Sequence, residues 1–317
     1  MRSAPIRTLR LITIAIAAYI AVCLTAGIFA AEGALHPARR SLGPEDRRLV
    51  EQATHGLAIL EDTNITAADG AVLRGWSLRP GNPNHDAVIL LHGLSDNRLG
   101  MMGYAEVLLG GGYTVLMPDA RAHGASGGEL ATYGLLERED IRRWFNWLAA
   151  HEHPRCIFGL GESMGAAQLL QSLPTEPNFC AVVAESSFSS FREIAFDRVG
   201  QFFHAGPWLG RVPLRPLVET AFLYARWKYA LDMTAVSPED AVARIQVPVF
   251  LIHGQVDGNI PVRHSRRIQA RQSQVVLWEV PSADHCGALS SAHEEFASRL
   301  DGWMRGHDRP GSVLRRQ

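Results

Sequence analysis

Lysine is almost absent from this 317-residue chain, which contains Lys228 alone. Since no GxxxxGK[ST] segment occurs either, the sequence excludes a phosphate-binding P-loop, and Schiff-base chemistry is left with one implausible candidate. An excess of charge of one sign is also lacking, because 31 basic side chains stand against 32 acidic ones. No overall positive field therefore exists to hold nucleic acid. Chemistry without a bound cofactor remains.

Cysteine is scarce, and the four present are too few for a disulfide scaffold. Cys156 and Cys180 each open an expected strand, so neighbouring parallel strands could bring them together. We expect two buried free thiols, because unpaired cysteine is commonly buried, whereas a disulfide would require an oxidising compartment. Metal signatures are missing as well: HExxH does not occur, and His151-x-His153 has no third ligand at a recognisable spacing. We expect no metal and no cofactor.

The longest uncharged run, residues 11–31, contains 21 residues. At about 1.5 Å per residue a helix of this length spans the roughly 30 Å of a bilayer core, which predicts a membrane anchor over residues 1–35. A cleaved signal peptide is the alternative, because Arg2, Arg7 and Arg10 precede the run and small residues follow it. The run exceeds the 7–15 apolar residues usual in signal peptides, which favours a retained anchor.

The arginines around this run do not fix its orientation, because three precede it and four follow between residues 39 and 48. Long domains translocate largely regardless of charge, while the short N-terminal segment before the run, which contains the three arginines, should stay in the cytoplasm. We therefore predict a single-pass membrane protein whose C-terminal bulk, with a domain over residues 50–307 and a tail over 308–317, lies on the non-cytoplasmic side.

After the leader, apolar segments of strand length alternate with helical patterns. An Asp-Gly turn at residues 68–70 separates two segments that predict an antiparallel hairpin. Continuous apolar strands separated by helices are typical of a mostly parallel sheet covered on both faces. The eight expected strands are residues 57–65, 71–78, 87–91, 113–117, 156–160, 180–184, 247–252 and 275–280.

Residues 189–245 interrupt this alternation with a helical pattern that contains nine of the 25 aromatic residues. The pattern predicts a helical insertion on the sheet scaffold. Aromatic residues at helical spacing usually pack against one another, and we expect most of these to do so, with a few left to line an apolar pocket.

The strongest motif is Gly161-Glu162-Ser163-Met164-Gly165, which follows an expected strand and precedes a helical pattern over residues 166–173. Small residues two positions before and after the serine allow strand and helix to approach, so that the serine is exposed on a strained turn. This context predicts that Ser163 is a nucleophile.

A serine nucleophile needs a base, and the base needs an orienting carboxylate. His285 lies in a loop just after the last expected strand, and Asp257 follows the strand before it. Catalytic groups collect at the carboxyl ends of strands in open α/β sheets. We therefore predict Asp257 as the acid and His285 as the base, with Glu185 as the reserve acid.

An oxyanion must also be stabilised by backbone N–H groups. Met164 follows the nucleophile directly, and a second donor should come from the loop after the third strand, where we choose Leu94. His92, which precedes a turn glycine in that loop, is expected to brace it.

Together, HGLSDN at His92, DARAHGASGG at Asp119, GESMG at Gly161, HGQVDGNIP at His253 and ADHCG at Asp284 resemble the serine hydrolases of the α/β-hydrolase superfamily. The resemblance is nearest to the prolyl-oligopeptidase-like and monoacylglycerol-lipase-like branches. It implies an α/β-hydrolase fold with a helical cap at 189–245, a catalytic triad, and a structural role for the segment after Asp119.

The resemblance and the membrane anchor imply a lipase-like serine esterase that cleaves apolar carboxylic esters or thioesters of small-molecule substrates. A serine peptidase or aminopeptidase of the same fold, or an anchored binding protein without catalysis, remains open. Fold and triad serve many acyl groups, so neither substrate nor oligomeric state follows from the sequence.

Overall fold

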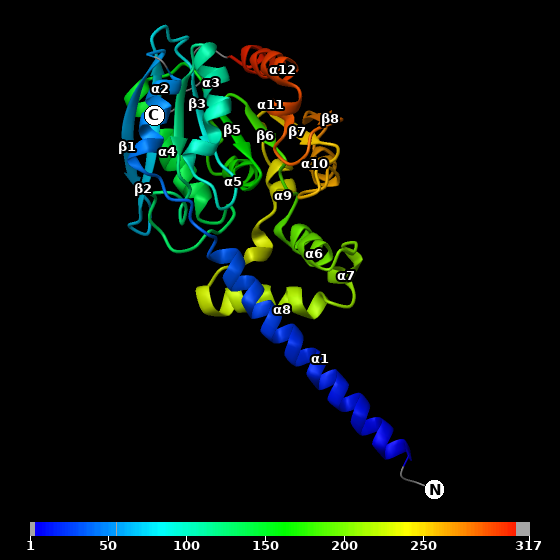
Figure 1. The fold of residues 1–317 in the computed structure, drawn as a ribbon. Helices are drawn as coiled ribbons and strands as arrows, with labels where there is room; N and C mark the ends of the chain where they lie inside the picture. Colours follow the sequence, from blue (N-terminus) through cyan, green and yellow to red (C-terminus); the bar gives the residue numbers. More distant parts are fainter. Residues whose placement is uncertain (1–3, 55, 309–317) are drawn as a thin grey trace. The chain divides into compact units, whose positions relative to one another are not determined.

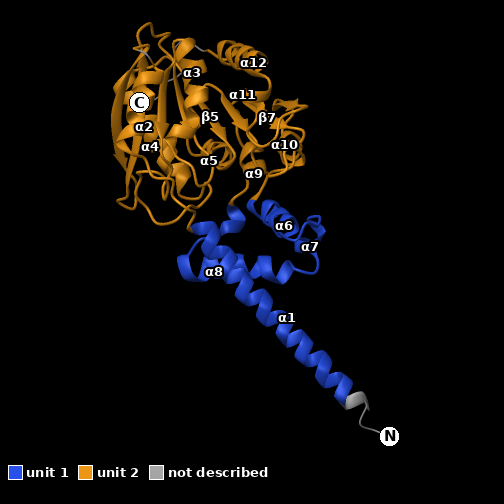
Figure 2. Ribbon diagram, in the orientation of Figure 1, with its two compact units in different colours: residues 1–35, 191–235 blue, residues 36–190, 236–317 orange. Residues whose placement is uncertain are grey.

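The computed structural model describes residues 4–54 and 56–308, with side chains from Arg7 onward. Residue 2 and most of the predicted tail, residues 309–317, lie outside the described residues. The chain forms two compact units (Figure 2). Residues 1–35 and 191–235 form what we call the helical unit, and residues 36–190 and 236–317 belong to the sheet unit. The insertion predicted at 189–245 contains all the helical unit's residues after α1, while its last helix belongs to the sheet unit.

The sheet unit is built on one eight-stranded sheet in the order β1-β2-β4-β3-β5-β6-β7-β8 (Figure 1). β1 and β2 form an antiparallel hairpin, β2 pairs antiparallel with β4, and every other pairing is parallel. This confirms the predicted mostly parallel sheet. The strands are β1 (Ala58–Thr66), β2 (Val72–Pro80), β3 (Ala87–Leu91), β4 (Thr114–Pro118), β5 (Ile157–Glu162), β6 (Val182–Glu185), β7 (Val249–Gly254) and β8 (Val276–Val280).

Helices cover both faces of the sheet, because strand side chains alternate between two apolar cores. On β3, for example, Val88 and Leu90 enter one core and Ile89 and Leu91 the other. The first core also contains residues of α2 (Pro44–Ala53), α3 (Met102–Gly110), α11 (Ala288–Ser291) and α12 (His293–Gly306). The second contains residues of α4 (Glu137–Glu152), α5 (Met164–Ser172), α9 (Pro238–Val242) and α10 (Arg263–Gln269). A short 3-10 helix, η1 (Arg98–Met101), precedes α3.

The helical unit consists of α1 (Ala4–Leu35), α6 (Phe191–Phe202), α7 (Trp208–Arg211), α8 (Arg215–Tyr229) and the 3-10 turn η2 (Met233–Ala235). Within α1, residues Arg7–Leu35 are long and apolar enough to cross a membrane, with a mean hydropathy of 2.4 in their most apolar window. The predicted anchor thus corresponds to a candidate transmembrane span.

Cys156 and Cys180 form a disulfide, so the expectation of two free thiols is wrong. Cys156 directly precedes β5, and Cys180 lies two residues before the start of β6. The two strands are hydrogen-bonded neighbours, and the Cys180 N–H donates to the Ile157 carbonyl over 2.9 Å. Their Cα atoms lie 5.8 Å apart, within the range that a disulfide needs. Strand pairing, which follows from the tertiary fold, therefore decides this link.

Candidate active site

The turn between β5 and α5 presents Ser163 in a strained conformation, with φ of 50° and ψ of −114°. A Cβ at Gly161 would lie 2.6 Å from the Gly165 backbone, and one at Gly165 would lie 2.2 Å from the Leu91 carbonyl oxygen. Neither distance is possible for a real side chain, so both glycines are sterically required. The motif therefore folds into the strand-turn-helix geometry that exposes the serine hydroxyl.

Three predicted site residues meet in a hydrogen-bonded chain. The Oγ of Ser163 lies 2.9 Å from Nε2 of His285, and Nδ1 of His285 lies 2.9 Å from Oδ2 of Asp257. The ionised carboxylate can only accept, so Nδ1 carries the proton and Nε2 is left to accept from the serine hydroxyl. This arrangement allows the imidazole to take a proton from Ser163.

The loops that carry Asp257 and His285 follow β7 and β8, which are neighbouring parallel strands. Their carboxyl ends lie at the same edge of the sheet as the end of β5, where Ser163 begins its turn. Asp257 is buried, and its Oδ1 accepts from the backbone N–H groups of Asn259 and Ile260 over 2.9 and 2.8 Å. These contacts fix the direction in which the carboxylate points.

His253 contacts the Asp257 end of this hydrogen-bonded chain, although the sequence motif alone assigned it no role. The ring is buried on β7, with Nε2 lying 3.3 Å from Oδ2 of Asp257 and 2.7 Å from the Ile260 carbonyl. Burial opposes ionisation of Asp257, but hydrogen bonds from His253 and His285 outweigh it and hold the pKa of the carboxyl well below its usual range. The sequence signal was the spacing of four between His253 and Asp257 within HGQVDG.

The two predicted oxyanion donors belong to segments beside Ser163. Met164 is the first residue of α5, whose initial N–H groups have no intrahelical acceptor. Leu94 follows Gly93, where an added Cβ would contact the Cβ of Ser163 at 3.6 Å. The loop after β3 therefore passes close to the serine, as an oxyanion donor requires.

His92 braces this loop. The ring lies with Nδ1 2.7 Å from the Gly93 carbonyl, and its Nε2 accepts from the Ala120 N–H over 3.0 Å. Burial, together with the neighbouring ring of His123, lowers the pKa of His92 to about 4. The ring is therefore neutral and bound on both sides, in keeping with the bracing role expected of it.

Glu185, the reserve acid, makes contacts other than a hydrogen bond to His285. One of its oxygens accepts from the Ala288 N–H over 2.9 Å and the other from the Tyr104 hydroxyl over 2.9 Å. The same hydroxyl lies 3.2 Å from Oε2 of Glu162. Burial and then the charge of Glu185 raise the pKa of Glu162 to about 7. Asp257, rather than Glu185, is therefore the carboxylate that meets the imidazole.

The segment after Asp119 is held by buried ionic contacts. Asp119 accepts from the Arg98 guanidinium over 2.6 Å and from the Ala125 N–H over 2.7 Å. Arg121 binds both oxygens of Asp140, over 2.7 and 2.9 Å. The contacts fix the turn after β4, as the resemblance implied.

Among residues 4–54 and 56–308, no group of three or more His, Cys, Asp or Glu side chains is arranged to hold a metal ion.

Comparisons with known proteins identify the family and the fold. Residues 88–299 match the model of the family described as "Alpha/beta hydrolase family". The uncharacterized protein YqkD of Bacillus subtilis is 27% identical over 245 residues, which cover 76% of this chain and 77% of that protein.

Solved structures share the architecture. An esterase from Pyrococcus furiosus is 26% identical with a TM-score of 0.68, covering 87% of this chain and 98% of its own. An acylaminoacyl peptidase from Pyrococcus horikoshii, at 17% identity and a TM-score of 0.59, covers 82% of this chain and 43% of its own. The latter likeness concerns the fold alone.

Proposed function

This chain belongs to the alpha/beta hydrolase family, and from that premise we propose that it is a serine hydrolase cleaving carboxylic esters or thioesters through an acyl-enzyme on Ser163. The observation that carries the proposal is the continuous hydrogen-bonded chain from Ser163 through His285 to Asp257. The likeness to the Pyrococcus furiosus esterase supports ester cleavage. The reaction needs no metal and no cofactor.

In the proposed mechanism the Oγ of Ser163 attacks the acyl carbonyl carbon while Nε2 of His285 takes the hydroxyl proton. The bond from the carbonyl carbon to the leaving oxygen or sulfur then breaks, and the imidazolium returns the proton to the leaving group. Water then attacks the carbonyl carbon of the acyl-serine ester while His285 takes one of its protons. The bond from that carbon to Oγ breaks, the imidazolium returns the proton to Oγ of Ser163, and the carboxylic acid leaves. Asp257 holds the imidazole in the productive tautomer and stabilises its charged form.

The negative charge that develops on the carbonyl oxygen is stabilised by the backbone N–H groups of Leu94 and Met164. The helix that begins at Met164 adds the positive end of its dipole at the same point. Loss of one such donor costs about 3 kcal/mol of transition-state stabilisation. The contribution comes from the backbone, so the side chain of Leu94, which is exposed, should matter little to it.

We propose an apolar, lipid-derived acyl ester as the substrate, because such a substrate suits the aromatic-rich insertion at 189–245. The candidate membrane span belongs to the same compact unit as most of that insertion, which supports a substrate drawn from a membrane. We propose a single-pass anchor at α1 with the catalytic unit on the non-cytoplasmic side. The disulfide between Cys156 and Cys180 supports that side, because disulfides persist in oxidising compartments.

The test is labelling by a fluorophosphonate probe, which reacts with activated serines. We expect labelling of the wild-type protein and of Ser282→Ala, a control at an exposed serine, and none of Ser163→Ala. Labelling that persists in Ser163→Ala would end the assignment. A folded wild-type protein without labelling or turnover would instead favour an anchored binding protein.

A peptidase of the same fold is distinguished by substrate. Rates on p-nitrophenyl esters of increasing acyl length are compared with rates on peptide amides. We expect turnover of the esters, with a preference for the longer acyl chains. A preference for the amides would replace the esterase proposal with a peptidase one.

A further inference from the structure

Helix α8 packs against the part of α1 that is apolar enough to cross a membrane (Figure 1). Cys23, Gly27 and Ala31 follow one another at every fourth position of α1, and all three are buried. A Cβ at Gly27 would lie 2.6 Å from the Leu217 carbonyl oxygen on α8, so the two backbones approach closely. Small residues at this spacing are typical of helix packing inside membranes.

The contacts with the insertion extend far along the apolar run. The Tyr19 hydroxyl donates to the Pro213 carbonyl just before α8, and Glu32 pairs with Lys228 at its far end over 2.7 Å. Tyr19 lies 12 residues from Ala31, a distance of about 18 Å along the helix. Residues 11–18, on the other side of Tyr19, are about 12 Å long, less than half of the roughly 30 Å core.

This length sets a limit on where the membrane can be. If α1 crosses a bilayer, residues 11–18 are too few to span it, so the segment around Pro213 must enter the hydrocarbon region. Tilting α1 does not remove this requirement. Even at a tilt of 40° from the membrane normal, the segment of α1 from Tyr19 to Ala31 spans about 14 Å of membrane depth.

The insertion is apolar on its surface where such immersion would require it. Phe202 is 78% exposed and Val212 72%, and both lie in the segment that leads to Pro213. Trp227, near the far end of α8, is 81% exposed. The other exposed large apolar side chains of α6–α8 and their connections are Phe203, Trp208 and Leu223. So many exposed apolar side chains in one small unit indicate an interaction surface.

Two arginines close to this apolar surface form ion pairs. Arg211, next to Val212, forms an ion pair with Glu193, and Arg215 lies 3.4 Å from Glu219. Ionic groups in low-dielectric surroundings are found mostly in such pairs. The pairing reduces the cost of bringing α7 and the start of α8 into lipid.

The other end of α8 has the composition of a membrane interface. Tyr224 and Tyr229 both donate to Glu32, with Lys228 on the same carboxylate and Trp227 beside them. Tryptophan and tyrosine are enriched at headgroup level, as are basic side chains. The part of α1 between Tyr19 and Glu32 therefore extends from an apolar environment at Tyr19 to one typical of a membrane interface at Glu32.

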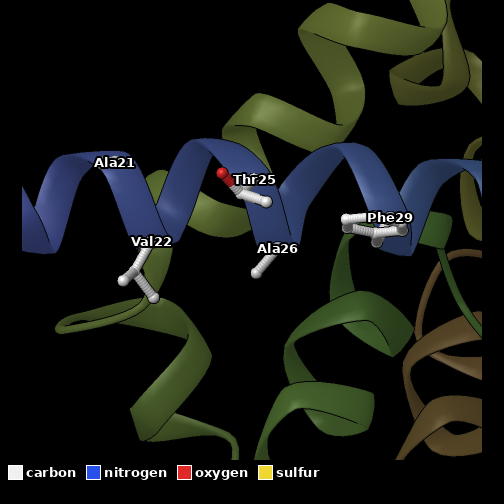
Figure 3. Close-up of a pocket in the computed structure, with 5 residues that line it drawn as sticks. All are labelled: Ala21, Val22, Thr25, Ala26 and Phe29. Carbon is white, nitrogen blue, oxygen red and sulfur yellow. The ribbon is translucent and has the colours of Figure 1, made fainter.

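On α1 itself, a groove of about 460 Å³ is lined by Ala21, Val22, Thr25, Ala26 and Phe29 (Figure 3). Its lining is apolar apart from one hydroxyl. A lipid acyl chain is the occupant whose chemistry matches such a lining.

We propose that α7, the start of α8 and the residues between α6 and α7 lie within the membrane beside α1, with a lipid bilayer as the partner of this surface. The inference rests on the proposed anchor and deepens it: the insertion is a membrane-embedded part of the protein, held to the anchor by small-residue packing and by the Glu32 pair.

The test is the depth of single spin labels on the full chain in vesicles of phosphatidylcholine and phosphatidylglycerol. Cysteines replace exposed apolar residues one at a time in a Cys23→Ala, Cys286→Ala background: Ile16→Cys for the anchor, Val212→Cys and Phe203→Cys for the insertion, and Ile59→Cys on β1 as the control. Collision with oxygen and with a water-soluble nickel chelate is measured for each, and circular dichroism verifies folding.

We expect the ratio of oxygen to nickel accessibility at residues 16, 203 and 212 to exceed the ratio at residue 59 severalfold. If residue 16 is in hydrocarbon while 203 and 212 match residue 59, the inference is overturned and the anchor stands. If residue 16 also matches residue 59, the anchor fails and the inference fails with it. Fluorophosphonate labelling of Ser163 is independent of all three results.

Discussion

At the scale of single residues, the proposed nucleophile Ser163 directly follows a carboxyl group whose pKa is raised. Glu162 precedes Ser163, is half-buried, and shares the Tyr104 hydroxyl with Glu185. The two carboxyls therefore titrate as a coupled pair, and burial favours their neutral forms near the strained turn.

This pair predicts a pH-dependent stability. The pKa of Glu162 is raised to about 7, so the folded state holds a proton that the unfolded state releases near pH 4.5. The contribution of Glu162 to the free energy of unfolding is therefore fully present below about pH 4.5. It is lost as pH rises through about 7, and the loss is roughly 3 kcal/mol at most. Urea unfolding of wild type and Glu162→Gln from pH 4 to 8 should show the variant gaining relative stability as pH rises. A difference in the free energy of unfolding between wild type and Glu162→Gln that stays constant from pH 4 to 8 would contradict the raised pKa of Glu162.

A second residue-scale prediction separates the two candidate acids. Asp257→Asn leaves the His285 ring without its anionic partner, and kcat should fall by about 10⁴-fold, as for the equivalent change in a serine protease triad. Glu185→Gln changes a carboxyl that contacts Tyr104 and the Ala288 N–H. This variant should lower the melting temperature, and its loss of kcat should be far smaller than that of Asp257→Asn. Steady-state ester hydrolysis and thermal unfolding of both variants measure the difference. A larger loss of kcat in Glu185→Gln would reverse the assignment.

At the scale of elements, the approach of α5 to β3 and β5 depends on the absence of side chains on the turn. A Cβ at Gly165 would lie 2.2 Å from a backbone oxygen of β3, which cannot rotate away. The strand and helix would have to separate, and the Ser163 hydroxyl would leave its position beside His285.

Gly165→Ala should therefore destabilise the protein by about 3 kcal/mol or more and reduce fluorophosphonate labelling. Gly302→Ala is the matched control, because no atom lies within 4 Å of its added Cβ on α12. Alanine favours a helix interior over glycine, so this control should gain up to about 1 kcal/mol. Equal effects of the two substitutions, measured by urea unfolding, would show that the turn is less crowded than described.

At the scale of the whole molecule, the chain combines a sheet unit that carries the candidate active site with a helical unit that carries the candidate membrane span. The disulfide at the start of β5 and β6 connects the proposed compartment to the stability of the fold. Its two cysteines are 24 residues apart in sequence.

Reduction should lower the free energy of unfolding by about 3 kcal/mol, the loop-entropy value for a closed loop of this length. Urea unfolding with and without a reducing agent measures the change, and alkylation followed by intact mass verifies that both thiols are free. The Cys156→Ser, Cys180→Ser double variant is the control, because a reducing agent should not alter its unfolding. An unchanged wild-type curve after verified reduction would contradict the prediction.

The sequence alone was enough to predict the mostly parallel sheet, the strand-turn-helix turn at Ser163 and the candidate membrane span, because each follows from a local pattern. Apolar strands, the glycines around Ser163 and the uncharged run from Leu11 to Ala31 are all read within a few turns of chain. Asp257 and His285 were also found locally, from their positions after expected strands.

Tertiary structure decided what depends on residues distant in sequence. The pairing of β5 with β6 joined Cys156 to Cys180. The carboxyl ends of the same two strands and helix α3 brought Glu162, Glu185 and Tyr104 together. The packing of α8 on Gly27 connected the insertion to the candidate membrane span. No local pattern contains these contacts, because burial, the pKa of a carboxyl and the closeness of two backbones depend on which elements become neighbours after folding.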